Sequence, residues 1–398
     1  MYNYDEILQK IESSRRFGKL PGVEVEAEML KSWGEPQKKI PFIHVAGTNG
    51  KGSVCAFLSS ILEKYGLRVG RFISPHLMDF RERITINGDM IPREAVTRLG
   101  NAMLERDYGM EPTMFDYCLL MAVLYFKEQH CDVMVIETGL GGRLDSTNAL
   151  GTPDVAVITR IGYDHMAILG DTLAQIAAEK AGIIKPGVSA VFAPQEKEAL
   201  DVLRQKADGR LAGEDDIAAV KEMHPLMLGD YQLENAAAAM LAAQIFLGDT
   251  QKAKEAIRQG IRQATWPGRM EILSENPYLM VDGAHNSNGI HALCGSLKKL
   301  YPGEKFHFVM GVMADKDYPQ MVEELLPLAL DFVTVTVDSE RALQGDQLAA
   351  WIKGQGVPAR SLQRVNEVLR LPVPGAKTIA LGSLYFIGEL RALWQQGG

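Results

Sequence analysis

The stretch Ile43-His44-Val45-Ala46-Gly47-Thr48-Asn49-Gly50-Lys51-Gly52-Ser53 runs from an apolar segment into a glycine-rich turn, and a helix-like segment follows. This order is typical of a phosphate-binding loop, because glycines let backbone N–H groups approach phosphate oxygens and a helix N-terminus favours negative charge. Lys51 can neutralise the β- and γ-phosphates, and Ser53 can face a metal ion. The residues expected to contact the nucleotide here are Thr48, Asn49, Gly50, Lys51, Gly52 and Ser53.

The match to the general pattern G-x-x-x-x-G-K-[ST] is imperfect. Val45 stands where the first glycine belongs, and Gly52 separates Lys51 from Ser53. The alternative interpretation is a flexible surface turn. The combination of a strand, several glycines, a lysine and a helix in this order favours phosphate binding, although nucleotide binding alone does not name a reaction.

Apolar runs that alternate with helix-like stretches indicate an α/β fold with a doubly wound parallel sheet. The helical segment at residues 230–262 ends at Thr265-Trp266-Pro267-Gly268, where proline and glycine suggest a joint between domains. We expect a phosphate-loop-type ATPase domain over residues 1–265 and a smaller Rossmann-like α/β domain over residues 266–398. The strands are expected at residues 41–46, 131–137, 154–159, 278–281, 306–310, 332–336 and 378–381.

Length and composition narrow the class of protein. A chain of 398 residues with 46% apolar residues is long enough for two cores. The net charge of −8 argues against a general nucleic-acid surface. The longest apolar runs are shorter than a membrane span, and the first residues lack the features of a signal peptide, so we expect a cytoplasmic protein. The four cysteines show no CxxC spacing and are expected to be reduced.

Several further motifs follow the glycine-rich loop along the chain. They are Ser74-Pro75-His76-Leu77, residues 137–148, Asp164-His165, residues 179–187, residues 232–235, Pro267-Gly268-Arg269, residues 282–286 and Gly382-Ser383-Leu384-Tyr385. Residues 47–53 resemble the nucleotide loop of the Mur ligase superfamily, and the other motifs resemble the folylpolyglutamate synthase/dihydrofolate synthase family over nearly the whole chain. Only 46 residues precede Gly47, which is too few for the extra N-terminal domain of the peptidoglycan Mur ligases.

The resemblance implies a reaction in which ATP phosphorylates a carboxylate and the amine of L-glutamate attacks the acyl phosphate, releasing ADP and phosphate. Catalysis of such a transfer comes mainly from positioning and from cations that stabilise charge. The residues implied to be catalytic are Lys51, His165 and Lys180. The residues implied to bind Mg²⁺, with two ions expected, are Ser74, Glu137, His165 and Lys180.

Lys180 matches a lysine that CO₂ carbamylates in the superfamily, which turns an ammonium into a carboxylate-like group. Carbamylation needs a neutral amine, which a buried lysine can provide. The alternative is an ordinary lysine on a helix surface. Without the resemblance, Glu137 would be read as a strand-end carboxylate and His165 as a polar core residue.

Further positions match nucleotide and substrate contacts of the family. Nucleotide contact is implied for Asn235, Arg269, Asp282 and His285, with the second domain closing over ATP and binding glutamate. Asp282 and Asn286 also fit a strand-end turn with a helix cap. The dihydropteroate or folate site is implied to include Leu20, Pro21, Gly22, Thr113, Phe115 and Asp145. An aromatic residue in an apolar helix, such as Phe115, is otherwise plain core.

The resemblance leaves alternatives open. Ser339-Glu340-Arg341 lacks the proline that relatives place before the arginine, and residues 186–228 are short, so no glutamate-binding residue is assigned. The competing functions are another Mur-type amide ligase with a different acid, or a non-catalytic nucleotide-binding protein. Within the family we expect both activities, addition of glutamate to tetrahydrofolates and to dihydropteroate, in a monomeric enzyme.

Overall fold

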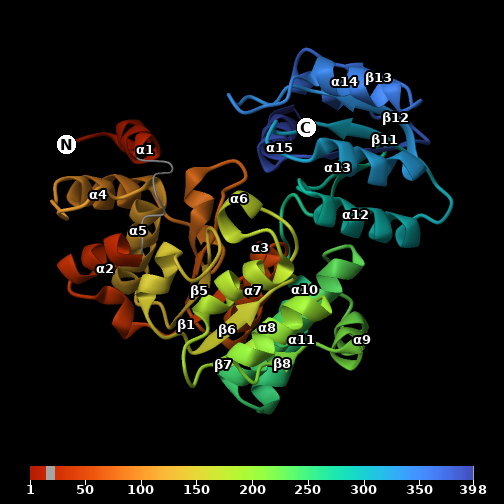
Figure 1. The fold of residues 1–398 in the computed structure, drawn as a ribbon. Helices are drawn as coiled ribbons and strands as arrows, with labels where there is room; N and C mark the ends of the chain where they lie inside the picture. Colours follow the sequence, from red (N-terminus) through yellow and green to blue (C-terminus); the bar gives the residue numbers. More distant parts are fainter. Residues whose placement is uncertain (15–22, 398) are drawn as a thin grey trace. The chain divides into compact units, whose positions relative to one another are not determined.

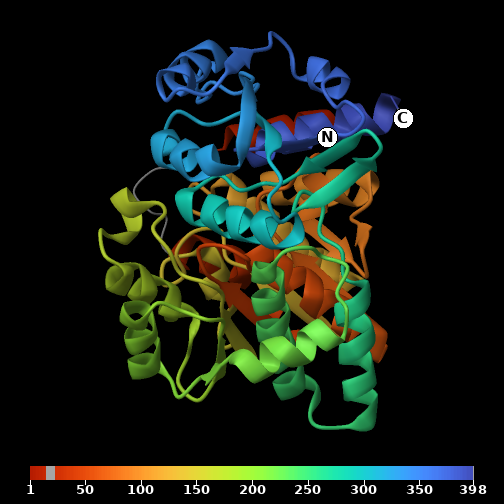
Figure 2. The same cartoon turned by 90° about the vertical axis from the view of Figure 1, so that its right-hand side faces the viewer.

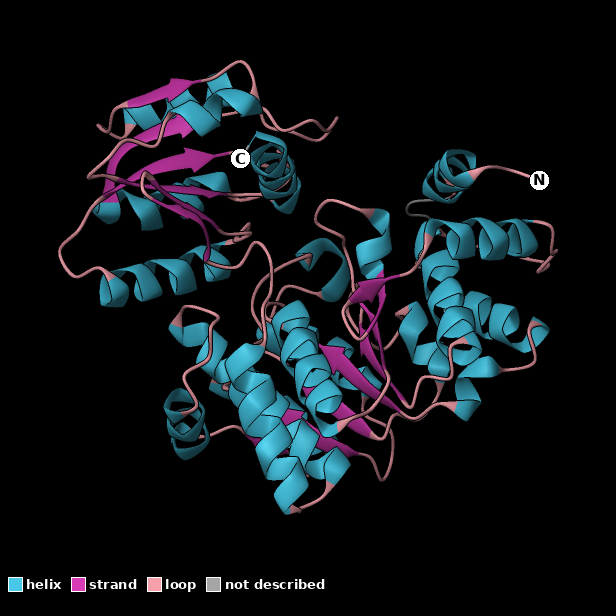
Figure 3. Cartoon of the chain, turned by 180° about the vertical axis from the view of Figure 1, so that it is seen from behind, coloured by secondary structure: helices cyan, strands magenta, loops and turns pink. Residues whose placement is uncertain are grey.

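The computed structural model describes residues 1–14 and 23–397, and the chain divides into two compact units (Figure 1). Each unit has its own sheet flanked by helices, with the strands shown in magenta in Figure 3. Unit 1 comprises residues 1–76, 80–226 and 233–264; unit 2 comprises residues 77–79, 227–232 and 265 onward. Which unit binds which substrate stays a prediction.

The helices and strands of unit 1 alternate along most of its length. Its strands are β1 (Phe42–Ala46), β2 (Val69–Phe72), β3 (Ile84–Ile86), β4 (Asp89–Met90), β5 (Val133–Glu137), β6 (Val155–Ile158), β7 (Ser189–Phe192) and β8 (Arg210–Leu211). Its α-helices are α1 (Tyr4–Ser13), α2 (Val23–Ser32), α3 (Lys51–Tyr65), α4 (Arg93–Leu104), α5 (Met114–Glu128), α6 (Met166–Leu169), α7 (Leu173–Lys180), α8 (Lys197–Lys206), α9 (Glu214–Glu222), α10 (Asp230–Leu247) and α11 (Gln251–Gln263). Its 3-10 helices are η1 (Pro36–Lys39), η2 (Phe80–Arg83), η3 (Ser146–Leu150) and η4 (Ala181–Ile183).

The strands of unit 1 form one eight-stranded sheet in the order β4-β3-β2-β5-β1-β6-β7-β8. The pairs from β2 to β8 are parallel, which confirms the predicted doubly wound arrangement. The edge formed by β3 and β4 is antiparallel and was not predicted, because strands of two or three residues carry too little alternation to be recognised. Strand β1 lies between β5 and β6, and all five of its residues are buried.

Alternating side chains divide the unit 1 sheet between two layers of helices. Phe42, Met134 and Ile136 point to the face where α5 packs with the N-terminal helices in one apolar cluster. Helix α3 contacts β1, β2 and β5, with α11 packed against it. Because successive residues of a strand face opposite sides, an apolar strand that is buried on both faces reads as a continuous run. This explains why the central strands were the easiest to predict.

Unit 2 repeats the α/β alternation on a smaller scale. Its strands are β9 (Glu271–Glu275), β10 (Tyr278–Val281), β11 (Phe306–Met310), β12 (Ala329–Thr334), β13 (Ala359–Ser361) and β14 (Lys377–Leu381). Its helices are α12 (Ser287–Leu300), α13 (Tyr318–Leu325), η5 (Leu326–Leu328), α14 (Gly345–Gly354), η6 (Val365–Arg370) and α15 (Leu384–Gly397). The sheet order is β13-β12-β11-β14-β10-β9, parallel except for the β9–β10 hairpin, drawn in teal in Figure 2.

The two faces of the unit 2 sheet carry separate apolar clusters. On β11, Phe306 and Phe308 belong to the cluster with α12 and α13, whereas Val309 belongs to the cluster with α15. This alternation places a core on each side of the sheet, as the period of two along a strand requires. The predicted second α/β fold is confirmed.

The described residues bear on two expectations, the lack of a membrane-spanning segment and the reduced state of the cysteines. No described helix is both long enough and apolar enough to cross a membrane. All four cysteines are buried and free, and burial raises the pKa of the Cys118 thiol to about 11. These cysteines therefore behave as small apolar core residues.

Candidate active site

The glycine-rich loop between β1 and α3 approaches neighbouring side chains too closely for any residue but glycine. Gly50 is the N-cap of α3 in the left-handed region (φ 89°), and a Cβ there would overlap the Asn235 side chain of α10. A Cβ at Gly47 would overlap Thr159, which follows β6. The fold therefore brings the predicted nucleotide residue Asn235 beside the loop, and helix α3 begins at Lys51 itself.

The loop is anchored by the segment that follows β6. Thr159 Oγ1 donates to the Asn49 carbonyl (2.6 Å), and the Thr48 N–H donates to the Arg160 carbonyl (3.0 Å). The Thr48 hydroxyl donates to the Gly162 carbonyl (3.1 Å) and accepts from the Gly162 N–H (3.0 Å). These bonds fix the backbone of the loop before any ligand arrives, which is the preorganisation that phosphate binding needs.

Lys51, Glu137 and Ser74 converge at the carboxyl ends of three adjacent strands. Parallel pairing sets Val45 of β1 opposite Glu137 of β5, and β2, which precedes Ser74, borders β5. Lys51 Nζ lies 4.0 Å from Glu137 Oε1, and the Ser74 N–H donates to Glu137 Oε2 at 3.4 Å. Glu137 is 5% exposed. Carboxylate and hydroxyl oxygens are ligands that Mg²⁺ accepts when phosphates and waters complete its shell, so Glu137 and Ser74 fit the predicted ion.

Lys180, the last residue of α7, reaches under the glycine-rich loop. It is buried, and its Nζ donates to the Gly47 carbonyl at 2.8 Å. Burial and the nearby charge of Lys51 lower the pKa of Lys180 to about 7, against an opposing effect of Asp164 and Asp145. A large fraction of this amine is therefore neutral at physiological pH, as carbamylation requires.

His165 occupies a special backbone position at the start of α6. It is the N-cap of that helix in the left-handed region (φ 51°), and its side chain is 49% exposed. Its Nε2 lies 3.9 Å from Asp164 Oδ1, and its backbone N–H donates to the same oxygen at 2.9 Å. Glu137 and Ser74 are in direct contact, whereas His165 is placed on the neighbouring loop after β6. Among the described residues no three His, Cys, Asp or Glu side chains are grouped as a metal site, and the predicted set relies on Ser74 and Lys180 as well.

Phe115 and Asp145 of the predicted acceptor site lie on either side of Gly139. A Cβ at Gly139 would be 2.8 Å from the Phe115 ring and 3.3 Å from Asp145 Oδ2. Phe115 is partly exposed and packs edge-on against Phe72, with 5.5 Å between ring centroids. It therefore belongs partly to the core and partly to a surface that a ligand can reach.

Thr113 and Asp145 both serve as helix caps. Thr113 caps α5 in a capping box with Asp116, donating its hydroxyl to Asp116 Oδ2 at 2.8 Å. Asp145 caps η3 and accepts from the N–H groups of Thr147 (3.0 Å) and Leu140 (2.8 Å). Burial raises the pKa of Asp145, and these hydrogen bonds oppose that shift. Leu20, Pro21 and Gly22 lie outside the described residues.

The predicted residues of unit 2 surround the carboxyl end of β10. Asp282 accepts from the N–H groups of Met270 and Ala284 (both 2.8 Å) and from the Tyr231 hydroxyl (3.2 Å). Burial raises the pKa of Asp282, and the charge of Arg269 opposes the shift. Arg269 Nη1 donates to the Gly268 carbonyl at 3.1 Å, and His285 Nδ1 lies 2.8 Å from the Gly283 carbonyl.

The alternative interpretation of the Asp282 motif is confirmed in part. Asn286 caps α12 by accepting from the Gly289 N–H at 2.8 Å, as expected for a strand-end turn with a helix cap. The Asp282 carboxylate orders that turn through Ala284. Nucleotide contact by Arg269, Asp282 and His285 stays a prediction.

Several residues of this region were not predicted from the sequence. They are Thr159 beneath the glycine-rich loop, Tyr231 beside Asp282, and the buried set His44, Asp116, Ser146 and Thr147 behind Asp145. The only local signal was His44, a titratable residue in the middle of an apolar strand. Ser146 and Thr147 lie within the motif at residues 137–148, but their contacts become visible only when distant segments are folded together.

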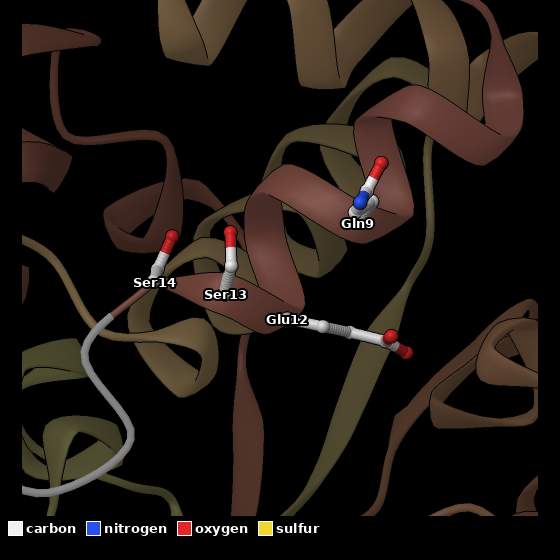
Figure 4. Close-up of a pocket in the computed structure, with 4 residues that line it drawn as sticks. All are labelled: Gln9, Glu12, Ser13 and Ser14. Carbon is white, nitrogen blue, oxygen red and sulfur yellow. The ribbon is translucent and has the colours of Figure 1, made fainter.

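Two surface hollows are lined by residues other than those of the glycine-rich loop. One is lined by Gln9, Glu12, Ser13 and Ser14 at the end of α1, and their side chains do not converge on one point (Figure 4). It contains none of the predicted residues. The other lies where residues 140–144 meet Ile168 and Leu169. Neither offers the phosphate-binding geometry of the glycine-rich loop.

Comparison with known families defines the class of this chain. Residues 45–211 match the Mur ligase middle domain, and residues 268–377 match the glutamate ligase domain of Mur ligases. A dihydrofolate synthase/folylpolyglutamate synthase of Bacillus subtilis is 36% identical, with 98% of each chain covered. The chain therefore belongs to the folylpolyglutamate synthase/dihydrofolate synthase family of Mur ligases.

Solved structures agree with this assignment over both units. A Mycobacterium tuberculosis folylpolyglutamate synthase complexed with ADP has a TM-score of 0.88 and 28% identity, with 98% of each chain covered. A bifunctional folylpolyglutamate synthase/dihydrofolate synthase of Yersinia pestis, complexed with AMPPNP and an Mn ion, has a TM-score of 0.86 and 27% identity, covering 99% of this chain and 98% of that one. The Mycobacterium tuberculosis protein thus binds ADP, and the Yersinia pestis protein binds an adenine nucleotide together with a divalent metal.

Proposed function

We propose that this chain joins L-glutamate to tetrahydrofolate and its polyglutamates, and also to 7,8-dihydropteroate, using ATP. The observation that carries the proposal is the convergence of Lys51, Glu137 and Ser74 beside a glycine-rich loop whose backbone is already fixed. Because the chain belongs to a family of ligases that form ADP, we interpret this geometry as the site of phosphoryl transfer. The product bond is an amide between the acceptor carboxylate and the glutamate amine.

The residues of this chain would act mainly by positioning and by charge. The acceptor carboxylate attacks the γ-phosphorus of ATP, the bond to the ADP oxygen breaks, and an acyl phosphate forms. Lys51 and the N–H groups of the loop would hold the phosphates and neutralise the charge that gathers on their oxygens. The glutamate amine then attacks the acyl carbon, loses a proton and expels phosphate.

Mg²⁺ would be held by Ser74 and Glu137, with His165 and a carbamylated Lys180 completing the predicted set of two ions. Bound there, the metal would supply Lewis-acid charge to the phosphate oxygens. Support for this arrangement comes from the contact of Ser74 with Glu137 and from the lowered pKa of Lys180, about 7. The Mn ion of the Yersinia pestis enzyme supports a divalent ion in general terms.

The acceptor ring would lie beside Phe115 and Asp145, with Thr113 behind them. Phe115 offers a partly exposed aromatic face, and Asp145 offers carboxylate oxygens to the N–H groups of a pterin. Activity on dihydropteroate is supported by the two bifunctional relatives. We further propose that the enzyme works as a monomer in the cytoplasm, which size-exclusion chromatography and cell fractionation would test.

The decisive experiment is phosphate release from ATP with Mg²⁺ and L-glutamate, run with dihydropteroate, with tetrahydrofolate and with neither acceptor. Product masses should increase by one glutamate residue. Turnover with both acceptors is expected. Turnover with tetrahydrofolate alone would limit the enzyme to polyglutamate synthesis, and turnover with neither would refute the proposed acceptor class.

A further inference from the structure

A buried chain of three side chains joins strand β1 to Asp145. His44 Nε2 lies 2.8 Å from Thr147 Oγ1, and Thr147 Oγ1 is hydrogen-bonded to Asp145 Oδ1. His44 and Thr147 are 0% exposed. Because 103 residues separate His44 from Thr147, only the fold creates this contact. His44 lies three residues before Gly47, so the strand that leads into the glycine-rich loop also reaches Asp145.

Two proton arrangements fit these distances. In the first, Nε2–H of His44 donates to Thr147, and the Thr147 hydroxyl donates to an ionised Asp145. In the second, a protonated Asp145 donates to Thr147, which donates to Nε2, and His44 carries its proton on Nδ1. Within residues 1–14 and 23–397, Nδ1 has no hydrogen-bond partner.

The unpartnered nitrogen carries a cost in both arrangements, because a buried donor and a buried acceptor each lose about 1–3 kcal/mol when they have no partner. The donors around Asp145 decide between the two arrangements instead. Burial, with a smaller effect of the Lys185 charge, lowers the pKa of His44 to about 3, so the imidazole is neutral in either case. Burial raises the pKa of Asp145, but the backbone N–H groups of Thr147, Leu140 and Gly139 all point at its carboxylate and favour the ionised form.

The direction of donation determines which oxygen of Asp145 remains available. Oδ1 accepts from both the hydroxyl and the N–H of Thr147. Oδ2 accepts from the Leu140 N–H at 2.8 Å and faces the position beside Gly139 and Phe115. The Gly139 N–H also donates to this carboxylate. Asp145 is therefore surrounded by backbone donors, and its Oδ2 borders the space beside the Phe115 ring.

We infer that His44 is a positioning residue of the acceptor site. Through Thr147 it holds Asp145 as an ionised acceptor whose Oδ2, beside Phe115, takes a hydrogen bond from an N–H group on the ring of the acid substrate. The inference deepens the proposed function and rests on it, because it assumes that Asp145 contacts the acceptor. His44 itself acts only through Thr147.

Paired variants test the hydrogen-bonded chain from His44 through Thr147 to Asp145, which we call the relay. In each pair, one variant removes the hydrogen-bond donor and the other replaces the residue but keeps a donor. His44→Phe removes the N–H, whereas His44→Gln keeps an N–H donor at a similar reach. Thr147→Val removes the hydroxyl, whereas Thr147→Ser keeps it. His44→Phe and Thr147→Val should raise the KM for the acceptor roughly tenfold, the equivalent of about 1.4 kcal/mol, with kcat and the KM for ATP within about threefold. His44→Gln and Thr147→Ser should stay within about threefold of the parent enzyme.

The tautomer gives a readout that does not depend on activity. In ¹⁵N-labelled protein, the His44 signal, assigned by its absence in His44→Gln, should show a neutral Nε2–H imidazole from pH 6 to 8. An Nδ1–H tautomer, or an unchanged acceptor KM in both His44→Phe and Thr147→Val, would overturn the relay. A parent enzyme that turns over neither acceptor would instead refute the proposed function, while the tautomer would still report on the hydrogen bonds.

Discussion

Each unit carries a carboxylate at the carboxyl end of a strand that has a neighbour on both sides, but the two carboxylates have different surroundings. In unit 1 Glu137 meets Lys51 at 4.0 Å and the Ser74 N–H at 3.4 Å, both long contacts. In unit 2 Asp282 accepts two backbone N–H groups at 2.8 Å and the Tyr231 hydroxyl at 3.2 Å. The Asp282 carboxylate therefore orders its own turn, whereas Glu137 lies beside the charge of Lys51 at the end of its strand.

Residues that match a family motif can therefore serve catalysis or serve the stability of the fold. Glu137 lies beside Lys51 at the glycine-rich loop, so its substitution should reduce catalysis more than stability. A residue such as Asp282 orders its own turn, so its substitution should reduce stability even if it also contacts a nucleotide. Each of the following experiments tests one side of this comparison.

The largest effect is expected for Lys51→Ala. Loss of one preorganised charge at the phosphates should lower kcat by a factor of about 100 to 1,000, with little change in the thermal midpoint. Lys64→Ala, an exposed lysine on the same helix, is the matched control and should behave like the parent enzyme. Steady-state phosphate release measures both. Near-normal turnover of Lys51→Ala would show that the unit 1 strand ends are not the site of phosphoryl transfer.

The second largest effect is expected for Lys180→Ala, with kcat about a hundredfold lower. If Lys180 acts as a carbamate, added short carboxylates such as acetate should restore part of the lost turnover. ¹³C-bicarbonate should label the parent enzyme at one lysine, and labelling should rise as pH passes through the Lys180 pKa of about 7. Exposed Lys197→Ala should keep both the label and the activity. No label and no rescue together would contradict carbamylation.

The sequence predicted the parts of the site that are local. The run from Ile43 to Ser53 contains the strand, the loop and the start of the helix, so its geometry could be anticipated. The sequence of residues 54–65 is helix-like, and helix α3 begins earlier, at Lys51, because Gly50 in the left-handed region already caps it. A local pattern therefore located the element and missed only its boundary.

The parts that depend on distant pairing could not be predicted in the same way. Thr147 meets His44 across 103 residues, and Tyr231 meets Asp282 across 51 residues. The short strands β4 and β8 have two residues each, too few for a period to appear. Polar residues that act through tertiary hydrogen bonds leave no spacing signal in a single sequence, so the structure was needed to find them.

Asp282→Asn tests the second side of the comparison. An amide has one acceptor oxygen, so one of the buried N–H groups of Met270 and Ala284 would face an NH₂ group. The free energy of unfolding of the transition that includes unit 2 should fall by about 1–3 kcal/mol. Tyr231→Phe removes a single hydroxyl and should cost about 0.5–1.5 kcal/mol. Urea unfolding followed by Trp fluorescence measures both changes, and unchanged stability of Asp282→Asn would show that its hydrogen bonds are dispensable.

The smallest effect is expected for substitution of Glu26. Both Glu26 and Asp282 are buried carboxyl groups, but Asp282 has several hydrogen-bond donors around it and Glu26 has none among the described residues. Glu26 is 0% exposed, and within the described residues neither of its carboxyl oxygens has a hydrogen-bond partner. Burial raises its pKa well above the ordinary value, and the charges of Asp116 and Asp145 add to the shift. The folded state therefore keeps its proton after the unfolded chain has lost its own. Stability falls as pH rises from the ordinary carboxyl pKa toward the raised one.

Glu26→Gln should therefore stabilise the protein where Asp282→Asn destabilises it. Glutamine does not titrate, so this substitution should raise the unfolding free energy by about 1 kcal/mol at pH 8 and by less at pH 5. The gain is smaller at pH 5 because this pH lies only slightly above the ordinary carboxyl pKa of the unfolded chain. Glu24→Gln, exposed on the same helix, should change stability at neither pH. Urea unfolding at the two pH values measures the difference. If Glu26→Gln destabilised the protein equally at both, Glu26 would have to be an ionised, partnered carboxylate, and the contrast between satisfied and unsatisfied buried carboxyls would fail.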